Sequence, residues 1–216
     1  MASAEPWDTI AAPARAELEV TRSRFIADLL PVSDREEVDA AIDAARRSFH
    51  GARHHCSASV LGVDGRLTRS NDDGEPAGTA GAPILAVLTG ERLTDVVAVV
   101  TRYFGGTLLG AGGLVRAYGG AVSAAVERAE RVRQRWIRVV TVRVGHADAG
   151  QLEHRLRGWA SDRTASVRPG RYGSHGVELD VVVAVEQADE VAALLAPLGV
   201  DHEVSVSEPA VRSLRP

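Results

Sequence analysis

Residues 96–118 read VVAVVTRYFGGTLLGAGGLVRAY, an apolar run followed by a glycine-rich loop and the start of a helix. The run Val96–Phe104 is apolar on both faces of an extended chain, which predicts a central strand buried on both sides. Gly105 and Gly106 end that strand. Apolar residues then recur at helical spacing from Gly112 to Ala129, so a long helix is predicted there. Its inward residues are Leu114, Tyr118, Ala121, Val122, Ala125 and Val126.

The chain upstream of this segment predicts a domain that mixes strands and helices. Ser33-Asp34-Arg35-Glu36 fits a capping box, with Ser33 as the N-cap of an amphipathic helix. Asp64-Gly65 is typical of a tight turn between two strands. The predicted elements are two short strands within 15–32, a helix from 33, strands 54–62 and 66–70, a loop over 71–83 and a short helix 82–88.

Downstream of Arg128 the pattern changes to strand, helix, strand, strand, helix, strand. The predicted ranges are 136–145, 148–160, 163–169, 176–185, 187–197 and 200–207. This βαββαβ order within about 75 residues is typical of a ferredoxin-like domain. The sequence therefore predicts a two-domain α+β protein. It consists of a flexible tail (1–14), an N-terminal βα domain (15–132) and a ferredoxin-like C-terminal domain (133–210).

Composition excludes several classes of function. The chain has 216 residues, 45% apolar and 25% charged, with a net charge of −4, which is typical of a soluble globular protein and not of one that coats DNA. All 25 basic residues are arginine, so lysine chemistry is excluded. A single cysteine, Cys56, cannot form an intramolecular disulfide. Residues 1–13 lack the apolar core of a signal peptide, and no apolar run could span a membrane, so we expect a cytoplasmic protein.

The glycine-rich loop is a candidate anion site. Glycine lets a backbone approach a ligand closely, and free amides at a helix N-terminus favour anions. The candidate residues are Arg102, Tyr103, Gly105, Gly106, Gly110, Gly112, Gly113 and Arg116. The spacing does not match a phosphate-binding Walker loop, because Ala111-Gly112 stands where Lys-Ser/Thr is needed. The alternative, in which the glycines only allow tight packing of helix on sheet, stays open.

A second candidate is the acidic loop, residues 71–81 (NDDGEPAGTAG), whose site residues are Asp72, Asp73, Glu75 and Thr79. Clustered carboxylates repel one another and favour a cation or arginine partners. Mg²⁺ held by Asp72, Asp73 and Glu75 is therefore a candidate, and no other cofactor is expected. We expect this loop to face the glycine segment in one cleft, with Arg102 and Arg116 as partners. A solvated acidic turn is the alternative.

Two further groups carry weaker signals. His54 and Cys56 share one face of a predicted strand, which is compatible with a thiol nucleophile beside a base. A buried, structural Cys56 is the favoured interpretation, because free cysteine is commonly buried. An arginine stripe at the domain boundary is either a nucleic-acid contact or a solvated face. It contains Arg128, Arg131, Arg133 and Arg135.

Several long strings in this chain resemble the IMPACT/YigZ family. They are Ser23–Ala27, Ala52–Cys56, Asp72–Gly81, Arg102–Gly106 and Leu109–Tyr118. The resemblance covers roughly residues 15–210, with Asn71 standing where relatives often have serine.

The resemblance implies an N-terminal domain with the fold of a small-subunit ribosomal protein's second domain. Elongation factor G domain four and kinases of the galactokinase type share that fold. The C-terminal half resembles the ferredoxin-like domain of bacterial family members, itself similar to an elongation-factor domain. Eukaryotic relatives regulate translation by binding a partner of a stress kinase through an added N-terminal domain, so that partner is not expected here.

Three functions remain as hypotheses from the sequence. The favoured one is a non-enzymatic, translation-linked regulator that binds RNA, the ribosome or a translation factor, with anion contacts at the glycine loop and the arginine stripe. The second is a Mg²⁺-dependent phosphotransferase or phosphohydrolase that uses the acidic and glycine loops. The third is a protein-interaction module. No catalytic base stands out in the sequence, which favours a protein without catalytic activity.

Overall fold

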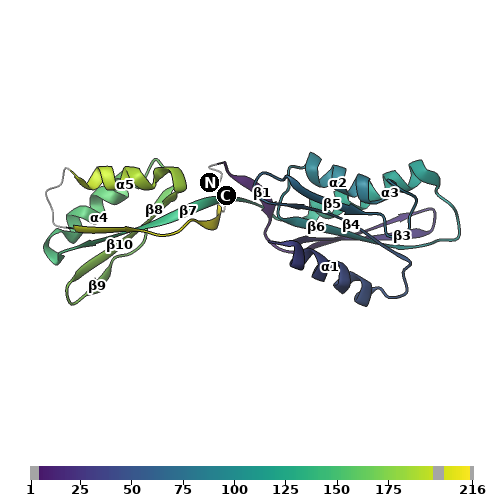
Figure 1. Ribbon diagram of the computed structural model, residues 1–216, viewed down its shortest axis with the longest axis horizontal. Coiled ribbons are helices and arrows are strands. Elements are labelled where there is room, and N and C mark those ends of the chain that lie inside the picture. The colour runs from purple at the N-terminus through teal and green to yellow at the C-terminus, as the bar shows by residue number, and fades with distance from the viewer. Residues whose placement is uncertain (1–4, 197–201, 215–216) are drawn as a thin grey trace. The chain divides into compact units, whose positions relative to one another are not determined.

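The computed structural model describes residues 5–196 and 202–214 (Figure 1). The chain divides into two compact units, Trp7–Arg133 and Gln134–Leu214, which we call the N-terminal unit and the C-terminal unit. Each unit combines a sheet with packed helices, so the α+β class predicted from the sequence is confirmed.

The N-terminal unit is built on one antiparallel sheet with the strand order β2-β3-β6-β4-β5. Its elements are β2 (Ala14–Val20), β3 (Ser23–Pro31), α1 (Arg35–Ser48), β4 (His54–Leu61), β5 (Leu67–Asn71), α2 (Gly81–Gly90), β6 (Val96–Tyr103) and α3 (Gly110–Arg128). In Figure 1, α2 and α3 cover one face of the sheet and α1 covers the other.

The central strand β6 is buried on both faces, as the sequence predicted, but it ends at Tyr103, and Phe104, the last residue of the predicted strand, is 53% exposed. Ala98 and Val100 belong to the larger core, which α2 and α3 complete. Val97 and Val99 belong to a smaller core against α1. A strand between two helical layers has no solvated face, which explains why its apolar residues run continuously instead of alternating.

Helix α1 begins with a capping arrangement shifted by one residue from the predicted one. Asp34 is the N-cap, and its carboxylate accepts a hydrogen bond from the Glu37 backbone N–H. The Glu37 carboxylate in turn accepts a hydrogen bond of 2.7 Å from the Ser33 backbone N–H. The prediction of Ser33 as N-cap was therefore wrong. Aspartate caps as well as serine does, and only the shift places Glu37 at the third helical position.

The N-terminal tail is shorter than predicted. Trp7–Ile10 forms β1, and Trp7 and Ile10 are 6% and 2% exposed. The Trp7 indole N–H donates to the Asp95 carboxylate at 3.1 Å, and the Thr94 backbone N–H donates to the Asp8 carbonyl at 3.0 Å. Apolar burial and these two hydrogen bonds hold the segment, so the expected flexible tail (1–14) does not extend to residue 14.

The C-terminal unit contains the predicted βαββαβ order. Its elements are β7 (Arg131–Val144), α4 (His146–Ala160), β8 (Ala165–Val167), β9 (Arg171–Gly173), β10 (Gly176–Ala184), a 3₁₀ turn (Val185–Gln187), α5 (Ala188–Leu195), β11 (His202–Val206) and β12 (Ala210–Leu214). The strands pair antiparallel in the order β11-β7-β10-β8, which is the arrangement of a ferredoxin-like sheet. Residue 197 of the predicted helix and residues 200–201 of the predicted last strand lie outside the described residues.

One face of this sheet packs against both helices. Val177, Val181 and Val183 of β10 lie in one core with Leu152 of α4 and Val191 of α5. The sequence analysis missed two short strands. β9 pairs antiparallel with the start of β10, and β12 pairs with β7. None of the helices in the described residues is long and apolar enough to cross a membrane.

Candidate functional site

The candidate site lies at the end of the N-terminal unit where β6 finishes. In the sheet register, Tyr103 pairs with Arg24 and Arg102 pairs with His54, so β3 and β4 both begin there. The site is at the right of the view in Figure 1. We call it the glycine-loop end, and it comprises residues 21–24, 53–56, 71–81 and 102–116.

A buried polar network stands behind the acidic loop. Arg102 Nη1 donates to Glu75 Oε1 at 2.7 Å, and the Tyr118 hydroxyl donates to the same oxygen at 2.7 Å. The side chains of Arg102 and Glu75 are only 7% and 4% exposed. Burial raises the pKa of Tyr118 far above its ordinary value, so its hydroxyl remains a donor. One carboxylate oxygen of Glu75 therefore accepts hydrogen bonds from two buried donors.

Cys56 is fully buried beside this network. Its thiol donates to the Asp72 carbonyl at 3.0 Å, and its sulfur lies 3.3 Å from the Tyr118 hydroxyl oxygen. Burial raises the pKa of Cys56 to about 12. Only the thiolate is an effective nucleophile, so the geometry favours a structural role. The His54 Nδ1 makes a 2.8 Å hydrogen bond with the Asp73 carbonyl, and the thiol's hydrogen bonds in the described residues go to Asp72 and Tyr118 and not to His54.

The Asp72 carboxylate caps the start of α2. It accepts hydrogen bonds from the backbone N–H groups of Gly78, Ala80 and Gly81 at 2.8, 3.0 and 2.7 Å. Burial alone would raise the pKa of Asp72, but these N–H donors together lower it below its ordinary value. Thr79 supports the same turn, because its hydroxyl donates to the Pro76 carbonyl at 2.7 Å.

Asp73 points to a different set of donors. Its carboxylate accepts a hydrogen bond of 2.7 Å from the His55 backbone N–H and forms an ion pair of 2.9 Å with Arg46 of α1. The three acidic side chains of the loop therefore diverge toward separate protein partners. Within residues 5–196 and 202–214, no group of three or more His, Cys, Asp or Glu side chains is placed to hold a metal ion. The donor geometry around Asp72, Asp73 and Glu75 does not fit a shared Mg²⁺.

The glycine segment packs against the β2–β3 turn. A Cβ on Gly105 would overlap the Arg22 carbonyl group, and the Gly105 N–H donates to the Ser23 hydroxyl at 3.1 Å. Arg22 donates to the Thr107 hydroxyl at 3.1 Å. Arg102 reaches the acidic loop as expected, but the expected pairing of Arg116 with that loop is not found among the described contacts. Close packing is thus a sufficient reason for Gly105.

The other glycines of the segment have different settings. Gly106 and Gly110 adopt φ of +85° and +68°, and a Cβ on either would meet nothing within 4 Å. Gly113 lies tightly against Leu109, and a Cβ on Gly112 would lie 3.6 Å from the Arg116 guanidinium. The backbone at Gly106 and Gly110 is therefore left-handed and open to solvent, which suits glycine at both positions.

The surface of the glycine-loop end combines apolar side chains with cations. Phe104 is 53% exposed and Leu108 is 87% exposed. In the described part of the chain, Arg22, Arg53 and Arg116 are exposed and form no ion pair with a carboxylate. A hollow of about 280 Å³ lies between β2 and the start of α3, lined in part by Leu108 and Arg116.

The β2–β3 turn at this surface has an unusual backbone. Thr21 and Arg22 adopt φ of +48° and +64°, the left-handed region that glycine, asparagine and aspartate normally occupy. Such a two-residue turn matches the twist of a hairpin, but a β-branched threonine there is strained. The strain is maintained by the contacts of Arg22 with Gly105 and Thr107.

The arginine stripe at the unit boundary is occupied by local partners. Arg131 forms an ion pair with Glu91, Arg133 lies 3.8 Å from the Asp8 carboxylate, and Arg135 lies 3.3 Å from the Glu186 carboxylate. Arg128 donates to the Arg15 carbonyl at 3.1 Å. Tyr103, a further candidate, lies beneath the Arg24 guanidinium at 5.0 Å.

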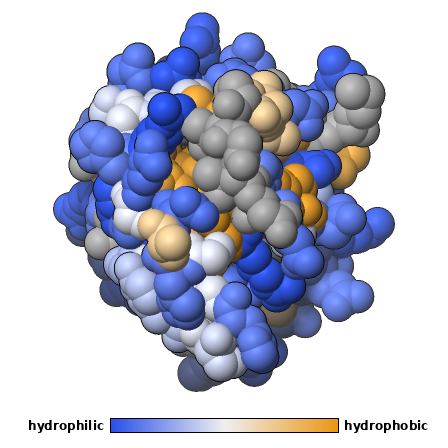
Figure 2. Space-filling view, turned by 90° about the vertical axis from the view of Figure 1, so that its left-hand side faces the viewer, coloured by the Kyte–Doolittle hydropathy of each residue, from blue (hydrophilic) through white to orange (hydrophobic). Residues whose placement is uncertain are grey.

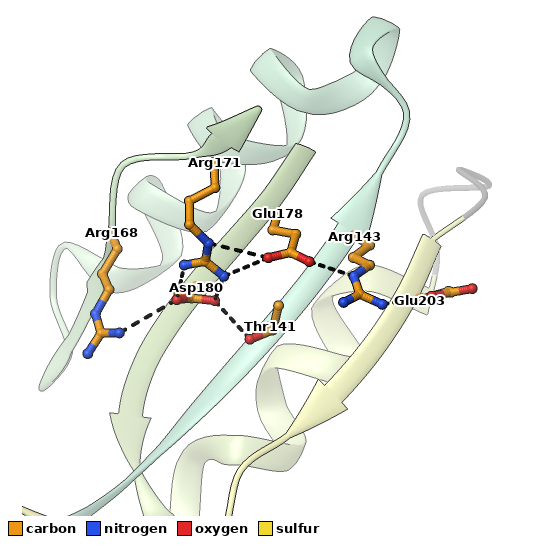
Figure 3. A network of polar contacts seen from close by, with 7 residues as sticks. All are labelled: Thr141, Arg143, Arg168, Arg171, Glu178, Asp180 and Glu203. Carbon is orange, nitrogen blue, oxygen red and sulfur yellow. Dashed lines mark hydrogen bonds and ion pairs between the residues drawn. The ribbon is translucent and has the colours of Figure 1, made fainter. Parts of the chain in front are cut away.

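A second group of charges crosses the C-terminal sheet (Figure 3). Glu203, Arg143, Glu178 and Arg171 alternate in sign across four strands, with successive ion-pair distances of 3.7, 2.7 and 2.8 Å. Hydrogen bonds from Arg171 and Arg143 lower the pKa of Glu178. Each charge has an opposite neighbour, so the row aligns the strands and leaves little net charge for a ligand.

Asp180 lies in the next row of the same sheet. Its carboxylate is bound by Arg171 at 2.5 Å and by the Thr141 hydroxyl at 2.8 Å, with Arg168 at 3.6 Å. These contacts, led by Arg171, hold the pKa of Asp180 below its ordinary value although burial opposes them. Nothing in the sequence distinguishes this aspartate, because Arg171 belongs to β9, which the sequence analysis missed.

A hollow of about 930 Å³ opens at the end of the C-terminal unit near β9, with Tyr172 70% exposed beside it. Figure 2 looks onto this end, where hydrophilic residues surround a few apolar ones. Its lining mixes Arg143 and Arg171 with Glu178 and Glu203, which already pair with one another. The glycine-loop end, with its unpaired cations, is the stronger candidate.

Sequence reasoning missed three residues of the site. Tyr118 was assigned to the core and not to the polar network, although a tyrosine on a buried helix face needs a partner for its hydroxyl. Arg22 and Phe104 were not singled out as surface residues. The signal for Arg22 was its place in a short turn between two strands. The signal for Phe104 was an aromatic residue at the end of a buried strand.

Comparison with known proteins places these features in a family. The family model for the Impact N-terminal domain matches residues 21–126, a range that contains the whole glycine-loop end. A crystal structure described as that of a hypothetical protein is 34% identical, with a TM-score of 0.63, and the match covers 93% of this chain and 96% of that one.

Curated relatives agree with this match. The IMPACT family member YvyE of Bacillus subtilis is 43% identical over 141 residues, which are 65% of this chain and 65% of that protein. An IMPACT family member of Thermus thermophilus is 41% identical over 139 residues, which are 64% of this chain and 74% of that protein. The chain thus spans less than two thirds of the length of the Bacillus relative. On these similarities, the chain belongs to the IMPACT family.

Proposed function

We propose that this protein is a non-enzymatic RNA-binding protein with a role linked to translation, and that it binds structured RNA through the glycine-loop end. The observation that carries the proposal is that Arg22, Arg53 and Arg116 are exposed and without ion pairs at the same glycine-loop end that exposes Phe104. Unpaired arginines beside an aromatic ring suit phosphates and bases together.

The charge distribution supports a local contact over a general one. The whole chain carries a net charge of −4, so nonspecific attraction to nucleic acid is weak. The carboxylates of the acidic loop are turned toward protein donors, and Glu75 is buried with Arg102. Their negative charge is compensated close to this surface, which leaves the cations of the glycine-loop end available to phosphates.

The family resemblance supports the link to translation. It implies an N-terminal domain with the fold of a ribosomal protein's second domain and of an elongation-factor domain, and its eukaryotic members regulate translation. Shared fold is weak evidence by itself, so the surface chemistry and not the fold carries the proposal.

Binding to an RNA stem-loop across a salt series tests this function. Contacts to about three phosphates on single-stranded RNA give a log–log salt slope of about −2. Arg22→Ala, Arg53→Ala and Arg116→Ala should each flatten that slope by about 0.7 and weaken binding to all sequences similarly. Arg155→Ala in α4, which removes an exposed arginine without an ion pair from the C-terminal unit, is the matched control and should leave the slope unchanged.

Two outcomes would overturn the proposal. One is the absence of RNA binding at low salt together with nucleotide turnover in the presence of Mg²⁺, which would favour the enzyme hypothesis. The other is a salt slope that depends on Arg131 and Arg133 but not on the three arginines of the glycine-loop end. That result would move the RNA surface to the arginine stripe.

A further inference from the structure

We propose that Phe104 is a stacking platform that receives one unpaired RNA base at the glycine-loop end. This inference rests on the proposed function and specifies which part of the RNA the surface recognises: a base in a single-stranded loop and not the edge of a duplex. It assigns a ligand contact to a residue that the sequence predicted only as the end of a buried strand.

The position of Phe104 makes one side of its ring available. It directly follows β6, and it is 53% exposed although it is large and apolar. The guanidinium of Arg102 lies 5.6 Å from the ring centroid. The ring is thus supported by a buried side chain on one side and reaches solvent on the other.

The support beneath the ring is held firmly. Arg102 lies between two aromatic rings, with Phe25 5.5 Å from the same guanidinium. Glu75 binds Arg102 at 2.7 Å and is itself bound by Tyr118. Because these groups are buried and mutually hydrogen-bonded, the Phe104 ring is preorganised, and a stacking ligand has little side-chain freedom to remove.

The loop that follows the ring leaves the neighbourhood open. A Cβ on Gly106 or Gly110 would meet nothing within 4 Å, and Leu108 is 87% exposed. Arg22 is tied to this loop through its hydrogen bond to Thr107. A cation of the β2–β3 turn is therefore held against the loop that follows the exposed ring.

These features select an RNA base over the apolar surface of a protein. Arg22, Arg53 and Arg116 have no carboxylate partner in the described residues, so the patch is complementary to an anionic ligand that also offers a flat apolar face. A nucleotide provides both, with its phosphate for the arginines and its base for the ring. Bases in an A-form duplex are stacked and unavailable, so the ligand must be single-stranded at the contact.

The test uses the full chain and a single-stranded RNA of about 12 nucleotides that carries one fluorescent 2-aminopurine, compared with the same strand in a blunt duplex. Phe104→Leu keeps an apolar side chain but removes the π-face, and it should weaken binding of the single strand about 5- to 150-fold. The salt slope should stay unchanged, because no phosphate contact is lost. Phe104→Trp should retain or strengthen binding. Leu108→Ala is the control for general apolar contact and should have little effect.

The outcomes separate this inference from the proposed function. Quenching of 2-aminopurine by the wild-type protein and loss of affinity in Phe104→Leu, with a melting temperature close to that of the wild type, support stacking. If Phe104→Leu fails to fold, stacking is decided by the affinity of Phe104→Trp for the single strand and by the quenching of 2-aminopurine by the wild-type protein. Wild-type binding with an arginine-dependent slope, but without quenching or any effect of Phe104→Leu, refutes the stacking inference alone. Failure of the wild-type protein to bind RNA refutes the proposed function as well.

Discussion

Replacing Glu75 with glutamine should destabilise the N-terminal unit severely. The substitution keeps the shape of the side chain but removes the charge that pairs with Arg102 at 2.7 Å. Arg102 is 7% exposed at its side chain, so its guanidinium would be left buried without a counter-charge. Breaking a buried ion pair from one side costs about 3–5 kcal/mol, and because the glutamine oxygen still accepts one hydrogen bond we expect about 3 kcal/mol.

The partner substitutions set the scale of this effect. Tyr118→Phe removes one hydrogen bond of 2.7 Å to a charged oxygen but leaves the ion pair, so it should cost about 1.5–3 kcal/mol. Glu75→Ala leaves both buried donors without an acceptor and should exceed either single effect. Since domains are stable by only about 5–15 kcal/mol, Glu75→Ala is expected to be close to unfolding.

Urea unfolding of the full chain, followed by far-UV circular dichroism and tryptophan fluorescence, measures these differences. The double replacement of Glu75 by leucine and Arg102 by methionine should be more stable than Glu75→Ala, because it leaves no unpaired buried charge. The reasoning fails if Glu75→Gln changes the free energy of unfolding by less than about 1 kcal/mol, or if the double variant is no more stable than Glu75→Ala.

Three further predictions follow from the same structure. The pKa of Cys56 is about 12 in the folded chain and lower in the unfolded chain, so the free energy of unfolding should fall by about 1.4 kcal/mol per pH unit above about pH 9. Cys56→Ala should remove this component from urea unfolding measured at pH 8–10.5, and an unchanged slope of stability against pH would contradict the prediction. Gly105→Ala should destabilise the chain by more than about 2 kcal/mol, because the new Cβ would overlap the Arg22 carbonyl group. Gly119→Ala on α3 is the control and should be neutral or stabilising, because its Cβ would make only ordinary contacts; equal melting temperatures of the two variants would count against the prediction. Because the pKa of Asp180 is lowered in the folded chain, the stability that its carboxylate contributes is present above its unfolded pKa near 4 and is lost on acidification. Asp180→Asn should therefore flatten the decline in stability below about pH 4, and an unaltered dependence of stability on acid pH would argue against this role of Asp180.

The elements of the fold were largely predictable because hydrophobic spacing is a local property. The continuous apolar run Val96–Val100 indicated a strand between two layers. The elements that were missed are short. β1, β9 and β12 have 4, 3 and 5 residues, too few for a period to be recognised.

The candidate site was predicted only in part. Arg102 and the acidic loop were placed together correctly, and Glu75 is the carboxylate that they share. The Mg²⁺ alternative needs three carboxylates that converge, but Asp72 binds backbone N–H groups at the start of α2 whereas Asp73 binds Arg46. Sequence spacing shows that charges are close along the chain, but it does not show which distant donor each of them meets.

The sequence by itself determined the order of strands and helices, the ferredoxin-like pattern of the C-terminal unit and the motifs that identify the family. These depend on the spacing of residues within one segment. The tertiary structure alone decided that Arg102 lies between Phe25 and Phe104, and that Phe25 is buried while Phe104 is 53% exposed. Both phenylalanines are equally apolar, but strand register places one beneath α3 and the other beyond the end of β6, and burial follows from that position in space.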